Sequence, residues 1–164
     1  MSNTSSVAYL RERLDQEWPP FHELVRSVPE SEMDVPGVTD EWCMKELLGH
    51  VNFWTRKGAT DLRLAGSGKA NEIETPGNQE NVDKWNAKAA SRGKATTAAV
   101  VVSELVDSHD DARRALDDAT DDTLSIEVNG WTVGVRFAED TYRHYREHSE
   151  QIRSWKQSLE TSEE

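Results

Sequence analysis

The chain has 164 residues, of which 19 are Lys or Arg and 31 are Asp or Glu, so its formal net charge is −12. This length fits one domain and suffices to bury a core without disulfides or a structural metal. The single cysteine, Cys43, excludes an internal disulfide, as is usual in a reducing cytoplasm. The sequence has no long apolar run and no N-terminal apolar leader, so it predicts neither a membrane span nor a secretory signal.

The acidic charge also restricts the partners that we expect. Binding to nucleic acid or to an anionic membrane needs clustered Lys and Arg, whereas carboxylates outnumber bases in most windows, including residues 107–122. The plainest interpretation of the charge is solubility. We therefore expect a cytoplasmic protein with a small-molecule substrate and neither nucleic acid nor membrane as a partner.

The first half of the chain predicts two long helices. Apolar residues from Leu10 to Val28 recur at helical spacing and predict a helix over residues 6–28, which Pro19 and Pro20 should kink or restart. A loop over residues 29–41 precedes a second helix, over residues 43–64, in which Cys43 takes the place of the usual capping residue.

The second half predicts a short helix, two further long helices and one hairpin. A polar loop over residues 66–78 leads to a helix over residues 80–91, which Gly93 should end. A long helix over about 96–119 follows. Residues 124–135 alternate around Asn129-Gly130 and predict a small hairpin, and a final helix spans 136–158.

Four long helices predict an all-α four-helix bundle with a short extra helix and a small hairpin before the last helix. We expect a single domain over residues 6–159, with flexible termini at 1–5 and 160–164.

The most informative local pattern is a pair of histidines, His144 and His148, four residues apart on the predicted last helix. This spacing places both rings on one helix face, as in the zinc motif H-E-x-x-H, but Tyr145 replaces the glutamate and excludes a metalloprotease. His50 is the best third ligand, because it sits among apolar residues of the second helix and needs a polar partner. Three imidazoles form an open, catalytic type of metal site.

Spacing alone leaves other interpretations open for these histidines. A histidine pair at this spacing is more often a solvated helix face, and a lone buried histidine is more often a hydrogen-bonded core residue. His22 and His109 have no partner in the sequence, and we predict that both are ordinary surface histidines.

Three segments resemble the DinB/YfiT-like superfamily, with its DUF1706 and mycothiol-dependent maleylpyruvate isomerase N-terminal branches. They are residues 41–54, which lead through an apolar run to His50 and Trp54; residues 83–86; and residues 141–155, with H-x-x-x-H followed by Gln-Ile and a Trp. The resemblance implies a four-helix bundle, usually a homodimer, with a divalent metal such as Zn, Ni or Fe. His50, His144 and His148 would be its ligands.

The resemblance further implies an enzyme that acts on a small molecule by hydrolysis or by thiol (S-) transfer, with a low-molecular-weight thiol in the second case, in a role such as detoxification. The alternative is a metal-free small-molecule-binding or self-resistance bundle, for which metal catalysis plays no part. The sequence does not choose between hydrolysis and thiol transfer.

Four more residues are candidates for supporting the site. Asp140 lies four residues before His144 and could orient its ring, or it could be a first-turn carboxylate that the helix dipole favours. Trp54 and Trp85 could line a pocket or belong to the core, and Asn86 could contact a ligand or cap a turn.

Overall fold

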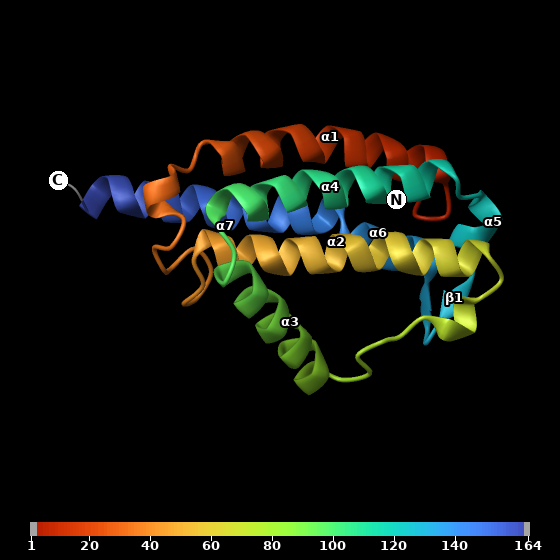
Figure 1. The fold of residues 1–164 in the computed structure, drawn as a ribbon. Coiled ribbons are helices and arrows are strands. Elements are labelled where there is room, and N and C mark those ends of the chain that lie inside the picture. Colours follow the sequence, from red (N-terminus) through yellow and green to blue (C-terminus); the bar gives the residue numbers. More distant parts are fainter. Residues whose placement is uncertain (1–2, 163–164) are drawn as a thin grey trace.

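The computed structural model describes residues 3–162, and four long helices lie side by side in it (Figure 1). These are α1 (Val7–Arg26), α2 (Met44–Gly66), α4 (Ala98–Asp117) and α7 (Tyr142–Ser162). Helix α2 packs against α4, and α1 packs against α7 and α4. The predicted all-α bundle is confirmed, and it brings α2 and α7, which carry the three candidate histidines, into one core.

The shorter elements sit around this bundle. Helix α3 (Gln79–Lys94) leans away from it at one end and contacts α2, as Figure 1 shows. The others are η1 (Glu30–Glu32), η2 (Ala70–Glu72), α5 (Asp121–Leu124), β1 (Glu127–Val128), β2 (Trp131–Thr132) and α6 (Val133–Asp140). Among the described residues, no helix is both long and apolar enough to cross a membrane.

The first two long helices begin at capping residues that the sequence indicates. The Ser6 hydroxyl accepts a hydrogen bond from the Tyr9 backbone at 3.2 Å and starts α1. At α2, the Glu46 carboxylate accepts from the Cys43 backbone N–H at 3.1 Å. Helix α1 does not restart at Pro19 and Pro20, because both prolines are exposed and water can satisfy the carbonyl groups that they leave free.

Helix α3 continues through Gly93 to Lys94, so the prediction that this glycine ends the helix is wrong. The glycine instead permits contact between two backbones. A Cβ at Gly93 would lie 2.2 Å from the Lys45 carbonyl oxygen, and a Cβ at Gly49 would lie 2.5 Å from that of Ala89. These two glycines let α3 approach α2 directly beside His50.

The predicted hairpin agrees with the structure, whereas the predicted last helix differs from it. Asn129 and Gly130 have φ values of 51° and 81°, as a type I′ turn requires, and Val128 pairs with Trp131. The predicted final helix is divided in two, because Thr141 leaves the helical conformation with φ −120° and ψ −99°. Its hydroxyl donates to the Phe137 carbonyl at 2.7 Å.

The predicted flexible termini are only partly described, since residues 1–2 and 163–164 lie outside the described range. Helix α7 continues past residue 159 to Ser162.

Candidate metal centre

Three histidines from two distant stretches of the chain meet inside the bundle. His50 comes from α2, and His144 and His148 come from α7. One ring nitrogen of each lies within 4.8 Å of the corresponding nitrogens of the other two. His50 and His148 are each 5% exposed, so neither lies on a solvated helix face. The three side chains are placed to share one metal ion.

Hydrogen bonds on the outer side of two rings fix which nitrogen faces the centre. His50 Nδ1 lies 3.1 Å from Asn86 Oδ1, an oxygen that only accepts, so Nδ1 carries the proton and Nε2 carries a lone pair. His148 Nδ1 likewise donates to Gln151 Oε1 at 2.6 Å, which leaves its Nε2 as a lone pair. Such outer partners set both the tautomer and the orientation of a ligating imidazole.

Asn86 also holds a second ring of the site. The Trp54 indole N–H donates to the same Asn86 Oδ1 at 2.7 Å. One amide oxygen on α3 therefore accepts from two residues of α2, His50 and Trp54. This shared acceptor couples the position of α3 to that of the His50 ring.

The inner nitrogens have unmet bonding capacity that a metal fits. His50 Nε2 faces His144 Nε2 at 3.2 Å, and because His50 Nε2 carries a lone pair, a proton or a cation must lie between the two. His148 Nε2 is buried and has no hydrogen-bond partner among the described residues. Buried polar atoms without partners are costly, so these residues fit a bound cation.

The pKa values of the three histidines also favour a bound metal. Burial, reinforced by the charge of His148, lowers the pKa of His50 to about 4. Burial also lowers the pKa of His144 well below its ordinary value, and that of His148 by less. All three rings are therefore neutral at pH 7, which is the form that binds a metal.

The structure places Asp140 away from this centre. The break at Thr141 interrupts the helix on which Asp140 and His144 would have shared a face. Burial raises the pKa of Asp140 well above its usual value, and the negative charge of Asp61 adds to this effect. The positive charge of Lys57 is the largest influence in the opposite direction. Asn86 and Gln151 hold imidazoles instead; Gln151 was not a sequence candidate, although it lies three residues after His148 on the same helix face.

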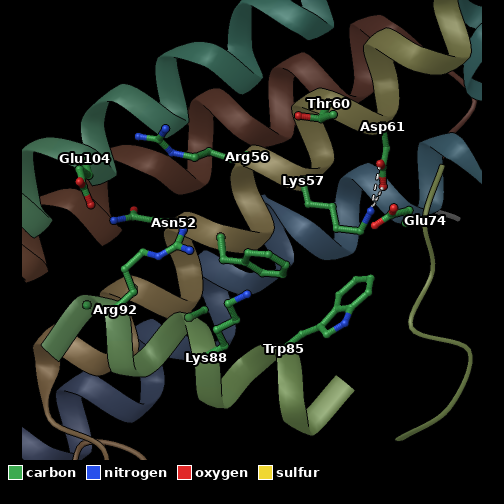
Figure 2. Close-up of a pocket in the computed structure, with 14 residues that line it drawn as sticks. Asn52, Arg56, Lys57, Thr60, Asp61, Glu74, Trp85, Lys88, Arg92 and Glu104 are labelled. Atoms are coloured by element: carbon green, nitrogen blue, oxygen red, sulfur yellow. Dashed lines mark hydrogen bonds and ion pairs between the residues drawn. The ribbon is translucent and has the colours of Figure 1, made fainter. Parts of the chain in front are cut away.

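The two candidate tryptophans lie on either side of the contact between α2 and α3. Trp54 bonds to Asn86 beside the histidines, and its ring centroid is 5.9 Å from that of Trp85. Trp85 lines a separate cavity of about 530 Å³ between α2, α3 and α4, which Figure 2 shows. None of the three histidines lines this cavity.

The prediction that His109 is a surface histidine is wrong. It is 6% exposed, stacks on Trp18 with ring centroids 4.0 Å apart, and its Nδ1 lies 3.1 Å from the Tyr145 hydroxyl. The signal was present in the sequence, since residue 109 shares a helix face with Leu105, Ala112 and Leu116. His22 is half-buried and also stacks on Trp18.

Comparisons with known proteins agree with this fold. The sequence model of the DinB superfamily matches residues 13–152, so the chain belongs to the DinB superfamily. Among solved structures, an uncharacterised protein from Escherichia coli UTI89 is similar at a TM-score of 0.80 and 17% identity, with 95% of each chain covered. A search of curated proteins found no match.

A second similar structure corrects one of our predictions. It is the colibactin self-resistance protein ClbS in complex with a dsDNA, similar at a TM-score of 0.79 and 16% identity over 92% of this chain and 94% of that one. The prediction that excluded nucleic acid as a partner is therefore wrong, because a protein of this fold is in complex with DNA. The argument used charge averaged along the chain, which does not describe the charge of a local surface.

Proposed function

We propose that the protein is a cytoplasmic, divalent-metal-dependent enzyme that acts on a small molecule by hydrolysis or by thiol transfer, with Zn, Ni or Fe held by His50, His144 and His148. The observation that carries this proposal is the meeting of three neutral imidazoles, two of them buried and the third half-buried, whose ring nitrogens lie within 4.8 Å of one another. Membership of the DinB superfamily supports it.

The ligand set favours catalysis over a structural role. Three imidazoles leave coordination positions open, whereas structural zinc sites are closed by four protein ligands. A metal bound there would supply Lewis acidity, which lowers the pKa of a water or a thiol. The chain's own contribution is to hold the rings neutral by burial and to orient two of them through Asn86 and Gln151.

A reconstitution assay tests this function. The protein is purified without a polyhistidine tag, stripped with a chelator and reloaded with Zn, Ni or Fe. Hydrolysis is followed on a panel of nitrophenyl esters and anilides, and thiol transfer on 1-chloro-2,4-dinitrobenzene with glutathione, bacillithiol or mycothiol. We expect activity to return only with metal, to be lost in His50→Ala and His144→Ala, and to persist in His22→Ala. Activity that survives chelation and both substitutions would contradict the proposal.

A second candidate function is supported by a different observation, the structural similarity to ClbS. Under it the bundle is a self-resistance protein that works without metal and binds a reactive small molecule, dsDNA or both. Fluorescence anisotropy with a labelled duplex tests this candidate. Duplex binding by metal-free protein that His50→Ala leaves unchanged favours it, and no binding by either form counts against a DNA-associated role.

A further inference from the structure

The cavity beside α3 gathers basic side chains in a chain that is acidic overall. Four basic and three acidic residues line it, a local formal charge of +1 in a chain whose net charge is −12. Elsewhere most arginines form ion pairs with carboxylates, namely Arg11, Arg63, Arg113, Arg114, Arg143, Arg146 and Arg153. The cavity therefore differs from most of the chain in carrying a small local excess of positive charge.

Three of its cations have no carboxylate within ion-pair distance. Lys57 is occupied, since its ammonium contacts Asp61 at 3.1 Å. Arg56, Lys88 and Arg92 are exposed and form neither an ion pair nor a hydrogen bond with any described residue. Figure 2 shows Lys88 and Arg92 extending from α3 toward α2, at the opposite end of the cavity from the Lys57–Asp61 pair and Glu74.

One carboxylate shares the basic end of the cavity. Glu104 projects there from α4, and no ion pair within 4.0 Å joins it to Arg56 or Arg92 in the described chain. It lowers the local positive charge without neutralising it. Removing this carboxylate should therefore strengthen the binding of an anion at this end. A Glu104 variant is thus expected to change the affinity in the opposite direction to variants that remove a basic residue.

Between its two charged ends the cavity offers aromatic surface. The half-buried rings of Phe53 and Trp85 line it, with their centroids 5.9 Å apart. The Lys57 ammonium lies 5.6 Å from the centre of the Trp85 ring. A planar ligand could pack on these rings while its charged group reaches Lys88 and Arg92, whose guanidinium group binds phosphate or carboxylate in a bidentate manner.

We propose that this cavity binds a small aromatic molecule that carries a phosphate or carboxylate group, with the anion held by Lys88 and Arg92 and the ring packed on Trp85 and Phe53. Its volume of about 530 Å³ lies within the range of roughly 300–1,000 Å³ typical of small-molecule sites. The proposal is independent of the metal centre, because no histidine lines the cavity and no step requires a metal.

Calorimetric titration at low salt tests the site with 2-naphthyl phosphate, 2-naphthoate, 2-naphthol and inorganic phosphate. We expect at least one of the two naphthyl anions to bind about tenfold more tightly than either 2-naphthol or inorganic phosphate, since only the anions engage both the rings and the cations. The naphthyl anion that binds identifies which charged group the cavity accepts. Equal binding of all four compounds, or none, would overturn the proposal.

Matched variants locate the binding. Lys88→Gln and Arg92→Gln should weaken it about tenfold each, and Glu104→Gln should strengthen it. Lys84→Gln is the control: it removes the same charge from the same helix, but Lys84 lies outside the cavity and pairs with Glu80. An equal loss of affinity for the naphthyl anion in Lys84→Gln would mean that the cavity does not bind it, and would contradict the proposal.

A DNA duplex provides a further outcome. If the duplex displaces the naphthyl anion and loses affinity in the same two variants, the cavity contacts a nucleic-acid backbone and the small-ligand proposal fails.

Discussion

At the scale of single residues, Asn86 links α3 to the candidate metal centre through one amide oxygen. It accepts from His50 Nδ1 at 3.1 Å and from the Trp54 indole at 2.7 Å. Asn86→Ala should leave both donors without this partner and free the His50 ring to rotate. We expect metal affinity, measured by titration against a chromophoric chelator, to fall about 10- to 100-fold.

Ser91→Ala is the control for this substitution, because Ser91 is exposed on the same helix. It should leave metal affinity unchanged. If Asn86→Ala binds metal as tightly as the unaltered protein, the amide does not orient His50 and its hydrogen bonds serve the packing of α3 alone.

A second residue-scale prediction concerns the buried His109. Burial lowers its pKa to about 4 in the folded protein, whereas the unfolded chain takes up the proton near the ordinary value of 6.5. Its contribution to stability is therefore complete above about pH 6.5 and is lost as the pH falls toward 4. For this one group the free energy of unfolding should decline by up to about 1.4 kcal/mol per pH unit in that window.

Urea unfolding at several pH values between 7 and 4 measures this effect in metal-free protein. The many carboxylates also titrate there, so the informative quantity is the difference between the unaltered protein and His109→Gln. We expect the variant to lose less stability per pH unit than the unaltered protein. Parallel curves would mean that the pKa of His109 in the folded protein equals its ordinary value of 6.5, and would contradict this prediction.

The residues of the metal centre differ in how far the sequence could predict them. The spacing of His144 and His148 placed both on one face of a helix, and the apolar neighbours of His50 indicated burial. That the two helices face each other followed only from the family resemblance, since spacing carries no information across elements. Asn86 was open to several interpretations because its partners His50 and Trp54 lie more than 30 residues away in sequence.

At the scale of elements, the contact between α2 and α3 depends on Gly49 and Gly93. A Cβ at Gly93 would lie 2.2 Å from the Lys45 carbonyl oxygen, a backbone atom that cannot move aside without shifting α2. Gly93→Ala should therefore displace α3 and with it Asn86. We expect a loss of about 1–3 kcal/mol in unfolding free energy, together with weaker metal binding.

Gly66→Ala is the matched control, because the nearest atom to its new Cβ would be 4.0 Å away. Alanine is the better helix former, so this variant should be neutral or stabilised by up to about 1 kcal/mol. Thermal unfolding measures the change in stability of both variants, and metal titration measures the change in metal affinity. If Gly93→Ala is as stable as Gly66→Ala, α3 does not depend on close backbone contact.

The elements that the sequence predicted best are those with local signals. Caps, apolar periodicity and the Asn129-Gly130 turn placed the long helices and the hairpin close to their observed bounds. Two features of the helices differ from the sequence prediction. Gly93 is kept inside α3 by its contact with α2, and no sequence pattern marked the break at Thr141 between α6 and α7.

At the scale of the whole molecule, net charge and local charge lead to different conclusions. The formal net charge of −12 is a sum over the whole chain. At one cavity, however, Arg56, Lys88 and Arg92 lie without an ion pair in the described chain. Whole-chain charge therefore does not describe the charge at this cavity, and it did not justify excluding nucleic acid for a fold that in ClbS is in complex with dsDNA. The homodimer that the family resemblance implies stays a prediction.

The measurement that tests the central claim most directly is the metal content of untagged protein, determined by elemental analysis on the unaltered chain and on His50→Ala, His144→Ala, His148→Ala and His22→Ala. We predict one Zn, Ni or Fe per chain in the unaltered protein and in His22→Ala, and loss of that metal in the other three variants while they remain folded. Unaltered protein that holds no metal even after incubation with these ions, or a metal that persists in His50→Ala and His148→Ala, would contradict the account.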